Sequence, residues 1–267
     1  MGNLTISKKI VVSVLAVSLV AFISAFLILS YYKGQTELYV HKDVDKTLQT
    51  SANNKIFAKK SVGISNAVSI ANDSAVKESL KTNDRKLAIK ALSTLGANMK
   101  ASTEFKNIKV HIHTKENNSF VRAWKPEKFG DDLSGFRHSI VKANAQKVAV
   151  NTFELGKAGL SIRSVLPIID KGTHLGSLEF IQGLNSVARS FDREKDAFLL
   201  LMDKRVSTVK TFKEDSIFKT HYVISQKFRN KPFMEDANSI DMKELFDKNH
   251  YISDKYYYTY IDRYKRF

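Results

Sequence analysis

The sequence contains no cysteine. This absence excludes a disulfide framework, a thiolate metal site and a cysteine nucleophile, so burial of apolar side chains has to stabilise the fold. The sequence also lacks the patterns of a nucleophile elbow, a phosphate-binding glycine loop and a zinc-binding helix. We therefore do not expect an enzyme, and nothing in the sequence indicates a cofactor.

Acidic residues are few relative to basic ones. The chain has 27 Asp and Glu against 43 Lys and Arg, and its formal net charge is +16. Taken alone, this charge would suit nucleic acid or an anionic lipid surface as a partner. The hydrophobic content of 43% is ordinary for a chain that folds into one or two domains.

Residues 10–32 contain no charged side chain, and about 20 apolar residues are enough to cross a hydrocarbon core of ~30 Å. The stretch ends in Tyr31 and Tyr32, which is typical of an interfacial aromatic belt rather than of a signal-peptide cleavage site. Lys8 and Lys9 precede the stretch, so residues 1–9 are expected to stay in the cytoplasm. We expect an anchor in the inner membrane with the bulk of the chain in the periplasm, where no nucleic-acid partner is expected.

Residues 33–105 are expected to form extracytoplasmic stalk helices. Apolar residues recur there at the three-to-four spacing of one helix face. They are Leu38, Leu48, Ile56, Val62, Ile64, Ala67, Val68, Ala71, Ala75, Val76 and Leu80. Asn83 is the expected cap of a second amphipathic helix. A weak apolar stripe of this kind usually packs against a partner helix, so we expect a homodimer through the stalk.

After the stalk the hydrophobic period changes to two, as in a strand. Alternation in residues 108–114 and 119–124 predicts a β-hairpin. A short helix capped by Asp132 or Ser134 is expected next, running to about Ala145. Three more strand-like runs, separated by glycine-containing turns, occupy residues 147–156, 158–169 and 175–183. The expected fold class is α+β, with a five-stranded antiparallel sheet and a long helix over one of its faces.

Four motifs follow one another in this region: Arg-x-Trp-x-Pro (122–126), Gly-Asp-Asp-Leu (130–133), Phe-Arg (136–137) and Gly-x-x-Ile-Arg (159–163). With the order of helices and strands, they make residues 33–267 similar to the double Cache ectodomains of bacterial methyl-accepting chemotaxis proteins. The resemblance implies a PAS-like, membrane-distal Cache module at residues 106–190 and a membrane-proximal Cache-like module at residues 191–267. It also implies ligand sensing in chemotaxis signal transduction.

The stalk is expected to cover one face of the sheet. The other face is the expected binding site for a small ligand, covered in part by the crossover, which is the segment between the second and third strands. Arg122 and Trp124 are two residues apart in one expected strand and therefore share a face. The other candidate ligand residues come from the crossover and the later strands: Phe136, Arg137, His138, Arg163, Glu179 and Gln182. Three arginines favour a planar anion, because a guanidinium group binds a carboxylate with two hydrogen bonds. We expect a small carboxylate or amino acid, and a purine stacked on Trp124 is the alternative.

These candidates also have purely structural explanations. Arg122 and Arg137 can pair instead with nearby carboxylates, namely Asp131, Asp132, Glu154 and Glu179. Trp124 can belong to the core. His111 and His113 share one strand face and resemble a metal pair, but no third ligand is evident, so we interpret them as part of an exposed polar face and expect no metal site.

The region after residue 183 is less regular. It predicts a linking helix at residues 184–198, a short helix at 242–246, and strands at 198–206, 222–224 and 256–261. In the family, a second membrane span, a HAMP linker and a cytoplasmic coiled coil follow such modules, whereas this sequence stops at 267. We therefore interpret the chain as C-terminally truncated, with an incomplete second module.

Three classes of function remain after these exclusions. The sequence favours the ligand-sensing part of a transmembrane chemoreceptor. The alternative is the ectodomain of a sensor histidine kinase or diguanylate cyclase, for which the sensing part would be the same. A structural adhesin would fit the anchor and the stalk, but it would not need a cup of tryptophan and arginine.

Overall fold

The structure is a computed structural model that describes residues 6–103, 108–156, 159–206 and 217–261. The chain divides into two compact units. One unit comprises Met1–Ser51, Lys243–Tyr251 and Tyr258–Phe267, and the other comprises Ala52–Met242 and Ile252–Tyr257. The second unit contains the sheet on which the candidate site lies.

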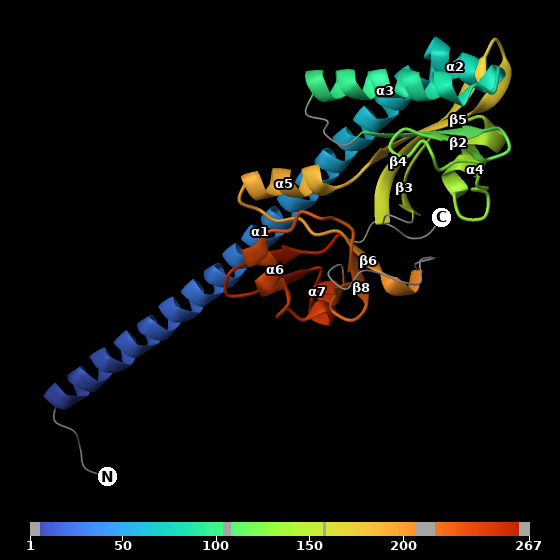
Figure 1. Cartoon of the computed structure of the whole chain (residues 1–267). Helices are drawn as coiled ribbons and strands as arrows, with labels where there is room; N and C mark the ends of the chain where they lie inside the picture. The colour runs from blue at the N-terminus through green and yellow to red at the C-terminus, as the bar shows by residue number, and fades with distance from the viewer. Residues whose placement is uncertain (1–5, 104–107, 157–158, 207–216, 262–267) are drawn as a thin grey trace. The chain divides into compact units, whose positions relative to one another are not determined.

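The N-terminal part of the chain forms one long helix, α1 (Ile6–Ala71), labelled in Figure 1. The uncharged residues 10–32 lie within this helix, and their large apolar side chains are exposed. Within the described part of the chain, α1 is the helix that is long and apolar enough to cross a membrane. Its length and composition therefore fit the predicted anchor.

Two aspartates divide the expected stalk into three helices. Asp73 caps α2 (Ser74–Lys81), and Asp84 caps α3 (Arg85–Ser102). Each carboxylate accepts a hydrogen bond from a backbone N–H of the first helical turn, which would otherwise lack a partner. The prediction of Asn83 as the cap is wrong by one residue, because Asn83 adopts a left-handed conformation with φ of 56° before the helix begins.

Five strands form an antiparallel sheet in the order β2-β1-β5-β4-β3, which confirms the predicted α+β fold. The strands are β1 (Lys109–Thr114), β2 (Ser119–Arg122), β3 (Val150–Gly156), β4 (Gly159–Asp170) and β5 (Thr173–Gln182). Lys171 and Gly172 both have positive φ and close the tight turn between β4 and β5, as two-residue hairpin turns require. The second strand is shorter than predicted: it ends at Arg122, so Trp124 lies in the turn that follows.

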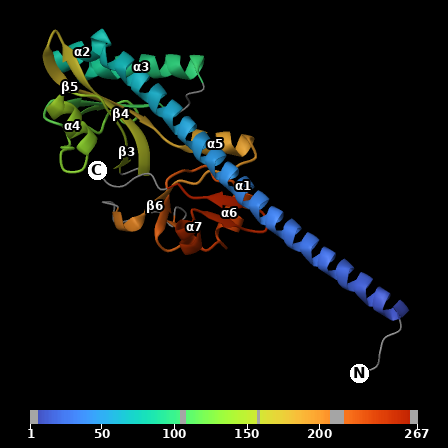
Figure 2. The same ribbon diagram turned by 180° about the vertical axis from the view of Figure 1, so that it is seen from behind.

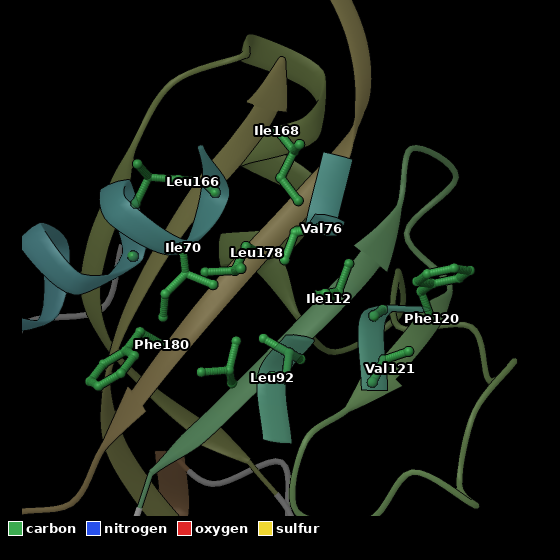
Figure 3. Close-up of a cluster of buried hydrophobic side chains, with 14 residues drawn as sticks. Ile70, Val76, Leu92, Ile112, Phe120, Val121, Leu166, Ile168, Leu178 and Phe180 are labelled. Carbon is green, nitrogen blue, oxygen red and sulfur yellow. The ribbon is translucent and has the colours of Figure 1, made fainter. Parts of the chain in front are cut away.

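One face of the sheet packs against α1, α2 and α3. Apolar side chains from the helices and the sheet form a buried core there, drawn in Figure 3, which includes Ile70, Val76, Leu92, Ile112, Phe120, Leu166, Leu178 and Phe180. A glycine allows α1 to come close to the strands. A Cβ on Gly63 would lie 2.2 Å from Gln182 Nε2 and 2.6 Å from Ser164 Oγ.

The opposite face of the sheet packs against α4 (His138–Gln146). Figures 1 and 2 show α2 and α3 on one side of the sheet and α4 on the other. The apolar cluster under α4 is small: Leu133, Ile140, Ala143 and Val165 are buried, with Phe136 and Val150 against them. The helix begins later than predicted, because Asp132 accepts a hydrogen bond from the Ser134 N–H at 2.9 Å and residues 134–136 form a turn.

Shorter elements follow the sheet. They are α5 (Asn185–Arg193), β6 (Leu201–Asp203), the 3-10 helix η1 (Lys204–Val206), β7 (Ile217–Phe218), β8 (Tyr222–Ile224), α6 (Lys231–Ala237), α7 (Met242–Lys248), β9 (His250–Ile252) and β10 (Tyr257–Thr259). β6, β8 and β7 form a three-stranded antiparallel sheet, and β9 pairs with β10.

The sequence predicted α5, β6, β8, α7 and β10 in this region, with longer bounds for β6 and β10, but it missed β7, α6 and β9. A signal for α6 was present in the sequence. The side chain of Asn230 accepts a hydrogen bond from the Phe233 N–H at 2.9 Å, and Pro232 occupies the first turn. An asparagine cap followed by a proline is typical of a helix start.

Candidate functional site

The candidate site lies on the sheet face opposite α1–α3. Strand pairing sets Arg122 of β2 opposite His111 of β1, and His111 opposite Glu179 of β5. Alternate residues of a strand share a face, so Arg163 and His113 also belong to this side. The strands thus present charged and histidine side chains on one face while their other face packs in the apolar core.

Glu179 is at the centre of this face, and its side chain is 0% exposed. Its Oε1 accepts a hydrogen bond from Arg163 Nη1 at 2.7 Å and another from Arg137 Nη2. Burial by itself raises the pKa of Glu179. The positive charges of Arg163 and Arg137 outweigh burial and hold the pKa well below its usual range. Glu179 is therefore a buried carboxylate ion.

Glu154 supplies a second carboxylate. It accepts a hydrogen bond from Arg137 Nε at 2.8 Å and two from Ser139, through its backbone N–H at 2.9 Å and its Oγ at 2.7 Å. Arg137, Glu154, Arg163 and Glu179 form what we term the charged cluster, in which two positive and two negative side chains balance. The structural explanation considered for Arg137, pairing with these two glutamates, describes this arrangement.

Arg122 lies beside the charged cluster and pairs with Asp131. Its two terminal nitrogens donate to the two carboxylate oxygens at 2.8 Å each, and Nη1 also donates to the Lys128 carbonyl at 2.6 Å. The hydrogen bonds from Arg122 lower the pKa of Asp131. The Asp131 side chain is 36% exposed, against 10% for Arg122. This pair is therefore the part of the face that solvent reaches.

Trp124 lies in the turn directly after Arg122 and is 40% exposed. Its ring lies 5.8 Å from the ring of His111, edge to face. Arg85 at the start of α3 fixes the loop that carries Trp124, because it donates to the Phe120 carbonyl at 2.8 Å and to the Pro126 carbonyl at 2.5 Å. The tryptophan is therefore presented to solvent from a loop held at both ends.

The structure brings Arg122, Arg137, Arg163 and Glu179 together on one face, as the sequence predicted. The expectation that Gln182 joins them is wrong. Its Nε2 donates to the Lys59 carbonyl of α1 at 2.8 Å, on the opposite face of the sheet. Positions 179 and 182 are three residues apart in one strand, and alternation sends their side chains to opposite sides.

The other predicted ligand residues lie around the edge of this face. Phe136 is half-buried and packs against the small apolar cluster under α4. His138 is exposed at the first position of α4. The N-cap of α4 is Arg137 rather than the predicted Asp132 or Ser134, and its side chain makes no hydrogen bond to the helix N–H groups. The role of Phe136 and His138 in ligand binding stays a prediction.

The interpretation of His111 and His113 as an exposed polar face is wrong. Their side chains are 2% and 0% exposed, because the crossover and α4 cover this side of the sheet. Burial lowers the pKa of His111 and lowers that of His113 well below its usual value, so both rings are neutral. Glu179 is the third group beside them, and one ligand atom of each residue lies within 4.8 Å of the others.

Sequence reasoning missed Glu179 as the neighbour of the two histidines. The alternation of β1 placed both histidines on one face, but the pairing of β1 with β5 sets His111 opposite Glu179. That register joins residues far apart in the chain, and no local pattern specifies it. Glu154 and Asp131 were recognised only as possible salt-bridge partners of the arginines.

Comparison with protein families decides the identity of the fold. The sequence matches the family dCache_3, described as "Double sensory domain of two-component sensor kinase", over residues 45–255. The chain belongs to the dCache_3 family. The matched region includes the whole five-stranded sheet and the candidate site, so the site lies in a dCache_3 sensory domain.

Several solved structures are similar to this chain at low sequence identity. The sensory domain of the Campylobacter jejuni chemoreceptor Tlp3 with isoleucine bound is 14% identical, with a TM-score of 0.50, and the match covers 84% of this chain and 86% of that one. The V. cholerae histidine kinase DctB sensor domain is 13% identical, with a TM-score of 0.48, covering 78% and 76%. A domain of a sensory box/GGDEF family protein from Vibrio parahaemolyticus is 12% identical, with a TM-score of 0.46, covering 80% and 86%. A search of curated proteins finds no match.

Proposed function

We propose that the chain is the extracytoplasmic, small-ligand-sensing part of a transmembrane chemoreceptor. The observation that carries this proposal is a dCache_3 sensory domain at residues 45–255, which begins shortly after the uncharged stretch 10–32. A sensor placed directly after a membrane span is suited to report a solute outside the membrane to the inside. The anchor at residues 10–32 and a homodimer through α1 are part of the proposal.

The ectodomain of a sensor histidine kinase is the second candidate. One observation favours it: the family description names a two-component sensor kinase. The ligand chemistry would be the same in both cases, since the two receptors would differ only in the output domain. Sequencing of the adjoining coding region distinguishes them: a cytoplasmic signalling coiled coil supports the chemoreceptor and a kinase domain supports the alternative.

The sheet face that carries the charged cluster and the Arg122–Asp131 pair is called the charged face below. We propose a small carboxylate, such as an amino acid, as its ligand. Arg122 supports this choice because it already binds a carboxylate, that of Asp131, with two hydrogen bonds. Asp131 is the more exposed partner, so a ligand carboxylate can replace it on the guanidinium group. Trp124, two residues after Arg122 and 40% exposed, is our proposed apolar wall for the rest of the ligand. The Tlp3 structure named above contains isoleucine, which is an amino acid.

The same strand that carries Glu179 also contacts α1. Gln182 at the end of β5 donates to the Lys59 carbonyl, and Asn151 of β3 donates to the Lys60 carbonyl at 2.9 Å. A ligand that shifts the strands relative to each other would therefore move α1 through these two contacts. A small displacement of α1 along its axis is the signal that we propose crosses the membrane.

The sole tryptophan makes a direct test possible. Trp124 lies in the proposed site, so its fluorescence reports binding there without a label. We would titrate the full chain in detergent with amino acids, organic acids and purines, and follow both the emission and the thermal unfolding temperature. We expect an amino acid or organic acid to change both signals, whereas a response to purines alone would contradict the carboxylate.

Variants of the arginine pair sharpen this test. Arg122→Ala should weaken binding of the best carboxylate at least tenfold, because the two hydrogen bonds to it are lost. Asp131→Asn should strengthen binding, since it removes the competing negative charge. Arg205→Ala is the matched control: Arg205 also pairs with an aspartate, Asp203, but it is exposed and outside this face. Unchanged binding in both Arg122→Ala and Arg163→Ala would refute the site.

A further inference from the structure

His111, His113 and Glu179 direct their unused polar atoms toward a common point. The other ring nitrogen of each histidine is already occupied: His111 Nε2 is 2.8 Å from Ser119 Oγ and His113 Nδ1 is 3.0 Å from Ser177 Oγ. His111 Nδ1 and His113 Nε2 remain, and they lie 3.7 and 3.9 Å from Glu179 Oε2.

These three atoms are not joined by ordinary hydrogen bonds. An N–H···O hydrogen bond has a donor–acceptor distance of about 2.7–3.2 Å, which is shorter than both separations. In the part of the chain that the structure describes, His113 Nε2 and Glu179 Oε2 are buried and have no hydrogen-bond partner. Buried polar atoms nearly always have a hydrogen-bond or ligand partner. Two such atoms without a partner, directed toward the same point, therefore indicate that a bound group belongs between them.

A divalent transition metal ion fits the spacing. In a tetrahedral site with metal–nitrogen distances of about 2.0–2.1 Å, neighbouring ligand atoms are about 3.4 Å apart. The two histidine–glutamate separations of 3.7 and 3.9 Å need to close by only a few tenths of an ångström, and all three ligand atoms lie within 4.8 Å of one another. We propose that His111, His113 and Glu179 bind one divalent transition metal ion, with Zn²⁺ as the representative.

The surroundings have the form of a metal site's outer shell. Metal-binding histidines usually hydrogen-bond through their second ring nitrogen, which fixes the ring orientation and the tautomer, and Ser119 and Ser177 do this here. Glu179 Oε1 accepts hydrogen bonds from Arg137 and Arg163, which leaves Oε2 directed at the histidines. Two imidazoles with one carboxylate suit Zn²⁺ and its neighbours, whereas Mg²⁺ and Ca²⁺ prefer oxygen ligands throughout.

The charges around the site limit its affinity. Arg122, Arg137 and Arg163 repel a cation, and Asp131, Glu154 and Glu179 offset them, so a metal ion adds positive charge to a balanced, buried group. Three protein ligands are also one fewer than in a closed structural zinc site, and a water molecule would take the fourth position. We therefore expect binding weaker than that of a four-ligand site. The proposal is independent of the sensing function, because it concerns the ion alone.

Trp124 also provides the readout for this proposal, since its ring is 5.8 Å from His111. We would treat the full chain in detergent with a chelator, remove the chelator, and titrate it with Co²⁺, a paramagnetic ion that quenches nearby fluorescence. We expect saturable quenching at one equivalent per chain, reversal by excess Zn²⁺, and no effect of Mg²⁺. Absence of quenching, or quenching that does not saturate near one equivalent, would overturn the proposal.

A pair of serine variants tests the site without removing a ligand. Ser177→Ala should weaken Co²⁺ binding about 10–100-fold, because the ring of His113 loses the hydrogen bond that orients it. Ser164→Ala is the matched control: both serines are 0% exposed, but Ser164 bonds to Asn151 on the helix-covered side. Equal affinities in the two variants would mean that Ser177 does not orient a ligand.

Histidine variants complete the test. His113→Gln should abolish saturable quenching, whereas the double change His41→Gln and His250→Gln should leave it intact. Those two rings form another, partly buried histidine pair, 6.0 Å apart, and they control for adventitious binding to histidines elsewhere in the chain. Circular dichroism of the metal-free variants checks that each is folded. Loss of quenching in the double variant but not in His113→Gln would refute the site.

Discussion

The two faces of the five-stranded sheet come from the same strands but are stabilised by opposite means. Leu178 and Glu179 are neighbours on β5 and both are fully buried. Leu178 packs among apolar side chains of α1–α3, where stabilisation is non-directional and is roughly 25 cal/mol per Å² of apolar surface buried. Glu179 depends on two arginines in defined positions. The comparison teaches that the helix-covered face supports the fold, while the charged face specifies one arrangement of side chains.

The largest effect should come from breaking the charged cluster. Glu179→Gln keeps the shape of the side chain but removes its charge, which leaves Glu154 as the one carboxylate of the charged cluster for two buried arginines. We expect the free energy of unfolding to fall by about 3–5 kcal/mol. Denaturant titration of the full chain in detergent, followed by circular dichroism, measures this.

An exposed glutamate is the control for that variant. Glu78 of α2 lies 3.9 Å from Lys81 and is half exposed, so Glu78→Gln should change the free energy of unfolding by less than about 0.5 kcal/mol. If Glu179→Gln had an equally small effect, the arginines would have found other partners and the cluster would not specify the face.

Truncating a side chain of the helix-covered face should lower the free energy of unfolding somewhat less than Glu179→Gln does. Leu178→Ala removes buried apolar surface and leaves a cavity, at a cost of about 2–5 kcal/mol in the free energy of unfolding. The value depends on how far the neighbours relax, and added salt should not alter it. The same titration with Val148→Ala, at a site that is largely exposed, should give a change within about 0.5 kcal/mol. A Leu178→Ala change as small as that of Val148→Ala would contradict the assignment of Leu178 to the core.

The contact between α1 and the sheet gives the next test. Gly63→Ala adds a Cβ within 2.2 Å of Gln182 Nε2, so the helix or the glutamine has to move. We expect a loss of about 1–3 kcal/mol in the free energy of unfolding. Gly96→Ala in α3 is the control, because nothing lies within 4 Å of its Cβ and alanine favours the helix by about 1 kcal/mol. If Gly63→Ala and Gly96→Ala both increased the free energy of unfolding, α1 would not approach the sheet so closely.

The smallest effect should come from the exposed edge of the charged face. Arg122 lowers the pKa of Asp131, so this pair contributes stability above the unfolded-state pKa of about 3.9 and loses it as the pH falls further. Because Asp131 is partly exposed, Asp131→Asn should reduce the free energy of unfolding by less than about 1 kcal/mol at pH 7. The difference from the unmodified chain should shrink below pH 4, and a constant difference would assign the effect to something other than the charge.

Much of the fold was predictable because its signals are local. Period-two alternation located the five strands, glycine-containing turns separated them, and the linking helix α5 followed from its polar and apolar pattern. The errors were also local. The α3 cap was placed one residue early, and the second strand was extended to Trp124, although pairing with β1 ends at Arg122. A single sequence does not say where a neighbouring strand stops supplying hydrogen-bond partners.

The candidate site was only partly predictable. Residue type identified three arginines as carboxylate-binding groups: Arg122, Arg137 and Arg163. In the structure their carboxylate partners come from the same chain and are Asp131, Glu154 and Glu179. His111 and His113 were predicted to be exposed, because nothing in the sequence of β1 indicates that α4 and the crossover cover this side of the strand. Burial depends on elements distant in sequence, which is why it reversed that interpretation.

The sequence by itself determined the five strands of the sheet, the uncharged stretch 10–32 and the residue types of the charged face, because propensity and hydrophobic period act over a few neighbouring residues. The tertiary structure alone decided that His111, His113 and Glu179 meet. This meeting follows from the register between β1 and β5, which is fixed when the apolar side of each strand is buried against the helices.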